Sequence, residues 1–129
     1  ALNEKEHAKL WAKALGLIGD TKENLKHAAE GENFEYSDMY VRMAREAEEE
    51  GHPELAKSFM MVAGVEKAHE TRYKKLLENI ETGQVFKRSE VRRWKCNNCG
   101  HIHEGDEAPA MCPTCQHPQA HFELFVETY

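Results

Sequence analysis

The chain of 129 residues has little of what a membrane, fibrous or nucleic-acid-binding protein needs. It contains four prolines and 9% aromatic residues, and no apolar run approaches the roughly 20 residues that cross a bilayer. The formal net charge is −6, which argues against the clustered basic face that tracks nucleic-acid phosphates. The mean hydropathy of −0.76 and the 31% charged residues therefore predict a small, soluble globular protein with no membrane or nucleic-acid partner.

The N-terminus also lacks an initiator methionine, a signal-like apolar segment and a helix cap. Residues 1–11 have instead the pattern of the middle of a helix. We therefore expect that the N-terminal part of the molecule has been lost or exists as a separate piece.

Only one proline lies in the first 84 residues, which leaves room for long helices. Helical periodicity and glycine stops predict helices over residues 1–15, 20–50 and 53–82. Asp20 and Glu23 have the spacing of a capping box at the start of the second helix. Because the two long helices are joined by a short connection, an up-down bundle is expected.

Acidic and imidazole side chains fall on helix faces that should be apolar. On the second predicted helix, the line of apolar residues at helical spacing passes through two glutamates. On the third, a Glu-x-x-His pair interrupts the corresponding apolar line. On the first, a second Glu-x-x-His pair lies in line with Trp11. These groups are Glu4, His7, Glu32, Glu35, Glu66 and His69. A buried unpaired carboxylate costs several kcal/mol or takes up a proton, so convergence of several predicts a cation among them.

This ligand set is typical of a di-iron or di-manganese carboxylate centre in a four-helix bundle. The template needs a Glu-x-x-His from each of two helices and a Glu from each of two others. The chain supplies both Glu-x-x-His helices, one Glu helix and a spare acid. We expect the missing first helix and its Glu to come from a separate fragment or from another chain.

The last 40 residues contain all four cysteines, as two Cys-x-x-Cys pairs: Cys96, Cys99, Cys112 and Cys115. A segment this short needs a metal or disulfides to hold a fold. Four thiolates at this spacing predict one tetrahedral metal, either a structural zinc or a single iron that carries electrons. Disulfides fit less well, because we expect a cytoplasmic protein with reduced thiols. His101 and His103 lie between the pairs and are expected outside the coordination shell.

The order of these motifs closely resembles the rubrerythrin family. The matching motifs are Glu-x-x-His, Gly-Glu-x-x-Glu-aromatic, a second Glu-x-x-His, Val-Phe-Lys-Arg, Trp-x-Cys-x-x-Cys-Gly, His-Glu-Gly, Ala-Pro-x-x-Cys-Pro-x-Cys and His-Pro-x-Ala-His-Phe-Glu. The resemblance implies a mainly α chain: a ferritin-like di-iron bundle over residues 1–84, without its first helix, and a rubredoxin-like iron domain over residues 85–129.

The resemblance also implies roles for individual residues. The six acidic and imidazole groups would ligate the di-iron centre, and Glu35 and His7 would exchange on one iron as its oxidation state changes. Tyr40 would donate a hydrogen bond to a ligand carboxylate. The four cysteines would hold the single iron.

The implied activity is reduction of hydrogen peroxide to water in oxidative-stress defence. Electrons would pass through the cysteine-bound iron from a donor protein such as rubredoxin or an NAD(P)H-dependent reductase, in a homodimer or larger oligomer. Two alternatives stay open: a ferroxidase or iron-binding protein, and a non-catalytic module with zinc at the cysteines.

Overall fold

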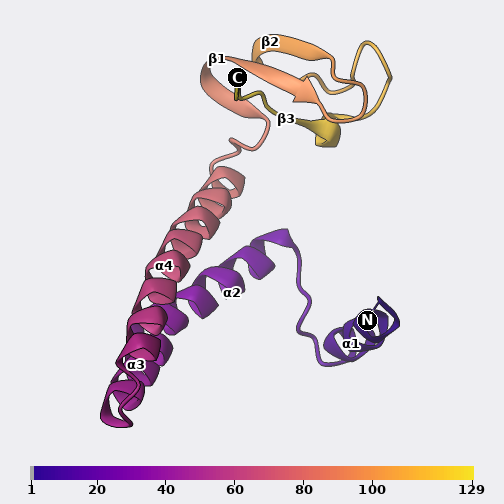
Figure 1. The fold of residues 1–129 in the computed structure, drawn as a ribbon. Coiled ribbons are helices and arrows are strands. Elements are labelled where there is room, and N and C mark those ends of the chain that lie inside the picture. The colour runs from indigo at the N-terminus through magenta and orange to yellow at the C-terminus, as the bar shows by residue number, and fades with distance from the viewer. Residues whose placement is uncertain (1) are drawn as a thin grey trace. The chain divides into compact units, whose positions relative to one another are not determined.

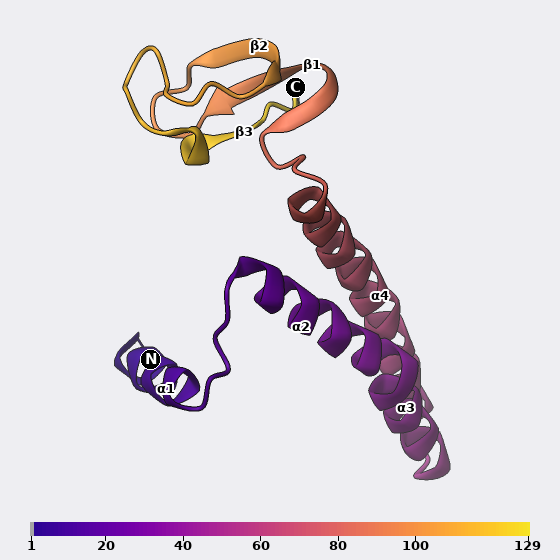
Figure 2. The ribbon, with the colours of Figure 1, turned by 180° about the vertical axis from the view of Figure 1, so that it is seen from behind.

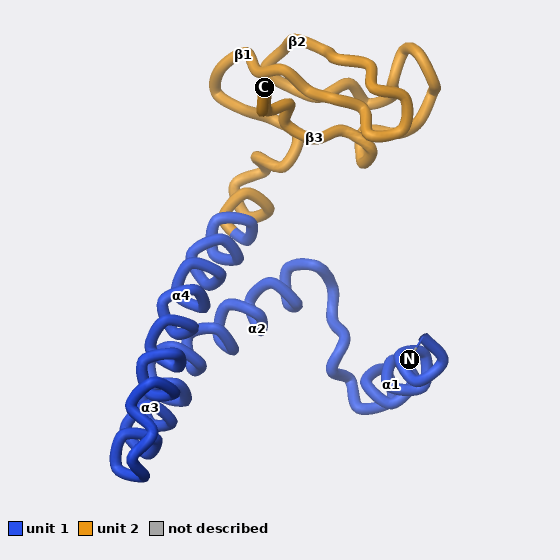
Figure 3. The backbone as a smooth tube through the Cα atoms, in the orientation of Figure 1, with its two compact units in different colours: residues 1–77 blue, residues 78–129 orange. Residues whose placement is uncertain are grey.

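A computed structural model describes residues 2–129, which form two compact units (Figure 3). The first unit ends at Leu77 and the second begins at Glu78, within the last long helix. Among the described residues, no helix has the length and apolar character required to span a membrane.

Helix α1 (Leu2–Ala14) buries none of its residues. Trp11, which the sequence places in line with Glu4 and His7 on an inward face, is 68% exposed. The prediction that α1 turns this face into a bundle stays a prediction, since the described chain by itself does not cover the face. The helix itself forms as predicted.

The predicted helix over residues 20–50 is interrupted. It consists of α2 (Thr21–Phe34), a π-helical turn η1 (Glu35–Met39) and α3 (Tyr40–Glu49). The capping box is confirmed, since Asp20 and Glu23 each accept the other's backbone N–H at 2.9 Å. The Tyr40 N–H donates to the Glu35 carbonyl five residues earlier, so one extra residue widens the helix at this point.

Helix α4 (Pro53–Glu81) follows α3 after a sharp turn (Figure 1). Gly51 has a φ of +83°, which permits the left-handed end of α3, and the His52 N–H closes the helix on the Ala47 carbonyl at 2.8 Å. The two helices pack through small side chains and one ring: Ala44, Ala47, Ala56 and Phe59.

The second unit is a small antiparallel sheet (Figure 2). Strand β1 (Lys87–Cys96) lies between β2 (Ile102–Glu107) and β3 (Phe122–Leu124), and a 3₁₀ turn η2 (Gln119–His121) leads into β3. Trp94 pairs with His103 on one side and with Leu124 on the other. This register fixes β1 as the central strand.

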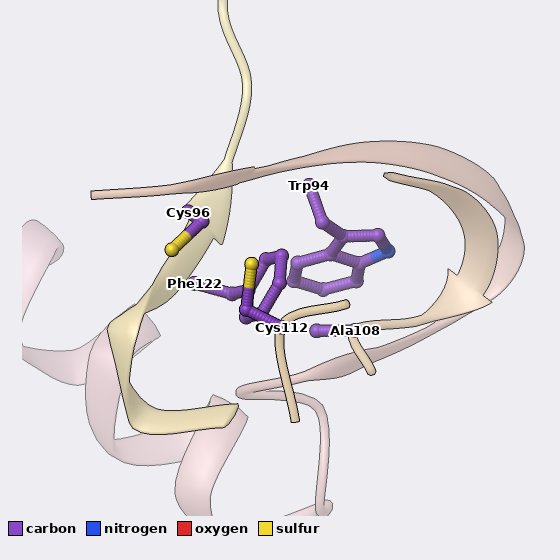
Figure 4. Close-up of a cluster of buried hydrophobic side chains, with 5 residues drawn as sticks. All are labelled: Trp94, Cys96, Ala108, Cys112 and Phe122. Carbon is purple, nitrogen blue, oxygen red and sulfur yellow. The ribbon is translucent and has the colours of Figure 1, made fainter. Parts of the chain in front are cut away.

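The core of this unit contains two of the four cysteines (Figure 4). Its members are Trp94, Cys96, Ala108, Cys112 and Phe122. Trp94 is fully buried, and its indole N–H donates to the Gly105 carbonyl at 3.0 Å, so no polar atom of the ring is left unsatisfied. A core of five residues is small, so anything that binds the cysteines contributes directly to its stability.

Two candidate metal centres

The four cysteine sulfurs of the second unit face one another at tetrahedral distances. All four lie within 4.8 Å of one another, and the Cys96–Cys115 and Cys99–Cys112 sulfur pairs are both 3.7 Å apart. A tetrahedron with metal–sulfur bonds of ~2.3 Å has edges of ~3.8 Å, whereas a disulfide brings its sulfurs to ~2.05 Å. All four cysteines are free thiols. The donor set therefore fits one tetrahedral metal.

The backbone holds the two Cys-x-x-Cys pairs in the same conformation. Gly100 and Gln116, each directly after a pair, have positive φ of 80° and 58°. Their N–H groups donate to the carbonyls of Cys96 and Cys112 at 2.8 and 2.9 Å. Each turn therefore directs two sulfurs to one point by short-range hydrogen bonds alone.

The thiols of this cluster differ in acidity. A hydrogen bond with the backbone of His117 lowers the pKa of Cys115 to about 5. The corresponding bond at His101 lowers the pKa of Cys99, but burial and the neighbouring sulfurs outweigh it and raise that pKa to about 12. Thiolates are the form that ligates metal, so binding of a metal to these sulfurs is coupled to the release of protons.

A second group of metal-ligating side chains lies between α2 and α4. It comprises Glu32, Glu66 and His69, with ligand atoms all within 4.8 Å of one another. His69 Nδ1 is 2.7 Å from a Glu66 oxygen and 3.6 Å from a Glu32 oxygen. The carboxylates of Glu32 and Glu66 are mostly covered, with side chains 17% and 13% exposed. Two carboxylates and an imidazole make a donor set that suits iron or manganese.

The environment of Glu32 favours its neutral form. Burial is the largest cause and raises the pKa of this carboxyl group, the nearby His69 lowers it, and the carboxylates of Glu66 and Glu35 raise it again. A bound cation stabilises the ionised form of a carboxyl group whose pKa is raised in this way. The raised pKa of Glu32 and the donor atoms of this group therefore both favour a bound cation.

The structure brings together three of the six predicted bundle ligands. Glu35 is half-buried at the start of η1 and acts electrostatically on Glu32, but it lies outside the gathered group. On α1, His7 Nδ1 lies 3.3 Å from Glu4 Oε2, and both side chains are exposed. Their part in the site stays a prediction.

Tyr36 contacts a carboxylate that lies outside the predicted ligand set. The ring of Tyr40 packs 6.1 Å from that of Phe59. Tyr36 instead donates to Glu70, which is 6% exposed and is the buried charged residue of the described chain. The sequence holds a signal for Glu70: it lies seven residues after Ala63 and four after Glu66, on the buried stripe of α4. Tyr40's role as a hydrogen-bond donor stays a prediction.

The hydrogen bond from Lys74 is the largest cause that lowers the pKa of Glu70, and those from Asn33 and Tyr36 add to it against the opposing effect of burial. This buried carboxylate therefore has compensating donors on two helices. Its neighbourhood is distinct from the Glu32–Glu66–His69 group.

Comparison with known proteins identifies both parts of the chain. The Rubrerythrin family model matches residues 1–77, and the model described as Rubrerythrin, rubredoxin-like domain matches residues 94–123. The rubrerythrin of Clostridium perfringens (strain 13 / Type A) is 51% identical over 146 aligned positions, which cover 100% of this chain and 75% of that protein. The rubrerythrin of Nitratidesulfovibrio vulgaris is 45% identical over 134 positions, with 94% and 70% covered.

Among solved structures, nigerythrin in a partially reduced state is 30% identical, with a TM-score of 0.48. The match covers 84% of this chain and 51% of the nigerythrin chain, so this chain spans about half the length of that relative.

Each family match covers one of the two groups of metal-ligating side chains. The ferritin-like di-iron domain covers the helices, and the four clustered cysteines match a rubredoxin-type iron site. The chain therefore belongs to the rubrerythrin family, a family of di-iron oxidoreductases of the oxidative-stress response.

Proposed function

We propose that this chain is a peroxidase that reduces hydrogen peroxide to water with two electrons and two protons per peroxide. The observation that carries the proposal is the presence of two unlike donor sets in one chain. Carboxylates and imidazole suit a metal that meets the substrate, and four thiolates suit one that only transfers electrons.

In this proposal the carboxylate centre is built from the six predicted groups. Glu32, Glu66 and His69 would hold the metals from α2 and α4, and three more ligands would come from Glu4, His7 and Glu35. When bound, the two irons supply Lewis acidity and electrons for cleavage of the O–O bond. Residues 1–84 form this domain, and residues 85–129 form the electron-transfer domain.

The chain's own side chains control charge and protons at this centre. Glu66 lies 2.7 Å from His69 Nδ1, so this carboxylate orients the imidazole within the ligand group. Glu35 and His7 would alternate as ligands of one metal, so that the charge of the ligand set would follow that of the metal. The Tyr40 hydroxyl donates to a ligand carboxylate and fixes its orientation.

The cysteine centre receives electrons from outside the chain. The donor is a protein such as rubredoxin or an NAD(P)H-dependent reductase, and the electrons then reach the di-iron centre of a neighbouring copy in a homo-oligomer. The four free thiols suit a reducing compartment, which we take to be the cytoplasm.

Two measurements test this proposal. The first counts the iron bound per chain in anaerobically purified protein. The second follows the NADH-linked consumption of peroxide in the presence of a rubredoxin and its reductase. We expect about three irons per chain, two at the carboxylates and one at the cysteines. Peroxide turnover should be lost in Cys112→Ser although the carboxylate iron is retained. Undiminished linked turnover in that variant would overturn the electron route.

The same samples distinguish the alternatives. Faster oxidation of the reduced centre by O₂ than by peroxide would indicate a ferroxidase. A colourless chain that holds zinc at the cysteines and no iron at the carboxylates, even after anaerobic reconstitution with ferrous iron, would indicate a non-catalytic module.

A further inference from the structure

A four-residue hydrogen-bond network links α2 and the π turn to α4. Its members are Asn33, Tyr36, Glu70 and Lys74. Glu70 lies at its centre and accepts from Lys74 at 2.6 Å and from Asn33 at 3.0 Å on one oxygen, and from the Tyr36 hydroxyl at 3.3 Å on the other. We call these four residues the Glu70 network.

The donors and acceptors of the network match one another. The amide of Asn33 has two hydrogens, and both are directed within the network, one to Glu70 and one to the Tyr36 oxygen at 3.0 Å. The Tyr36 hydroxyl thus accepts one hydrogen bond and donates one. Because the Glu70 side chain is only 8% exposed, its contacts are directional bonds to a covered charge and not a solvated surface pair.

Three members of the network each come directly after a predicted metal ligand in the sequence. Asn33 comes directly after Glu32, and Glu70 directly after His69; Tyr36 likewise follows Glu35. Consecutive residues of a helix point about 100° apart, so the network lies beside the ligand group on the same two helices. It contains none of the three gathered ligands.

Apolar packing gives little to fix α2 against α4 at this level. The buried residue of α2 is Ala29, and the buried apolar residues of α4 are Ala56 and Ala63. Small side chains without interlocking shapes leave the rotation and sliding of the two helices weakly defined. A rotation by one residue would turn Glu32 away from Glu66 and His69.

We propose that Glu70 is a positioning residue, whose hydrogen bonds to Asn33 and Tyr36 hold α2 in the rotation that brings Glu32 to Glu66 and His69. The inference rests on the proposed function in taking these three groups as metal ligands. It adds that the ligand geometry depends on a carboxylate that itself binds no metal.

The test uses the metal-free full chain titrated with Co²⁺, whose thiolate bands report the cysteine site separately in the same sample. Glu70→Gln keeps the size of the side chain and removes its charge. We expect Co²⁺ affinity at the carboxylate site to fall roughly 10-fold or more, as for loss of other outer partners of metal ligands. Cobalt binding at the cysteines should not change.

Two control variants separate positioning from a general loss of stability. Glu30→Gln removes an exposed acid of α2 that lies 3.9 Å from Lys26, and it should leave Co²⁺ affinity unchanged. Phe59→Ala weakens the α3–α4 packing away from the network, and it should lower the unfolding midpoint with a smaller loss of affinity than Glu70→Gln. Adding Asn33→Asp to Glu70→Gln exchanges acceptor and donor and should restore part of the affinity.

Unchanged affinity in Glu70→Gln, or a loss that Phe59→Ala reproduces at equal stability, would overturn the positioning role. If the wild-type chain binds Co²⁺ only at the cysteines, the proposed carboxylate site fails by itself. In that case NMR of the metal-free chain tests the positioning role of Glu70. The chemical shifts of the Glu32 carboxyl carbon and the His69 ring nitrogens should change in Glu70→Gln but not in Glu30→Gln. Identical shifts in wild type and Glu70→Gln would overturn it.

Discussion

The two metal centres differ in the distance along the chain over which their ligands are gathered. The cysteine ligands all lie within residues 96–115 on two similar turns, and their four sulfurs come together in one unit. The predicted carboxylate ligands extend from residue 4 to residue 69 over three helices, and three of the six are gathered. Ligands on one turn are fixed by local hydrogen bonds, whereas ligands on separate helices depend on how those helices pack.

The packing around the centres differs in the same sense. Cys96 and Cys112 are fully buried beside Trp94 and so belong to the core of their unit. The helical unit buries alanines and one paired carboxylate, Glu70. A metal at the cysteines would therefore bind side chains that also form the core of their unit, whereas the carboxylate group lies among helices whose buried side chains are mainly alanines.

The largest effect is expected from serine substitutions at the cysteines. Cys99→Ser and Cys112→Ser each remove one ligand and should abolish the iron–thiolate absorption. Since Cys112 is buried and Cys99 is exposed, the hydroxyl of Cys112→Ser should destabilise the second unit by a further ~1–3 kcal/mol. Urea unfolding of both metal-free variants, followed by near-UV circular dichroism, measures the difference. Equal unfolding free energies would mean that this cysteine serves the metal alone.

The next largest effect is expected on iron binding, and it distinguishes the gathered ligands from those on α1. Glu66→Ala removes a carboxylate from the gathered group and should lower iron affinity at the carboxylates by more than the ~10–100-fold that loss of an outer partner costs. His7→Ala should remove one of the two irons and leave the other. Iron counts on anaerobically reconstituted protein provide the comparison, and Lys9→Ala on the same helix is the control. A wild-type count in His7→Ala would exclude α1 from the centre.

A smaller effect is expected at the start of α2. Asp20→Ala removes the N-cap whose oxygen accepts the Glu23 N–H, which should cost about 1 kcal/mol of helical stability. The loss should be visible in urea unfolding by far-UV circular dichroism and leave the iron–thiolate spectrum unaltered. Glu23→Ala breaks the reciprocal bond and should act in the same direction. A changed thiolate spectrum would contradict this expectation, because it would mean that the loss of the cap also affects the second unit.

The smallest effect is a pH dependence within the sheet. The hydrogen bond from Lys95 is the main cause that lowers the pKa of Glu123 from 4.5, and one with Asn97 adds to it. A lowered folded-state pKa means that the ionised Glu123 stabilises the sheet above pH 4.5 and that this contribution is lost as the pH falls further. Unfolding midpoints between neutral and acid pH should thus decline less in Glu123→Gln than in wild type. Lys95→Met should flatten the profile in the same way, and a profile unaffected by both would contradict the pairing.

Features with a local cause could be predicted from the sequence. The Asp20–Glu23 capping box, the stop before Pro53 and the tetrathiolate site all depend on residues a few positions apart, and each is present. The π turn at residues 35–39 was not predicted, because helical periodicity tolerates one extra residue without losing its stripe. Residues Tyr36 and Glu70 were missed because their contact spans two helices.

By itself, the sequence determined which residues can ligate metal and which turns they occupy, because spacing along a helix or a Cys-x-x-Cys turn is a covalent property of the chain. Tertiary structure decided which of these groups meet. It gathered Glu32 with Glu66 and His69, left Trp11 exposed on α1, and buried Glu70 beneath donors from two helices. Those outcomes depend on the rotation and packing of whole helices, which are set by contacts between residues far apart in the sequence.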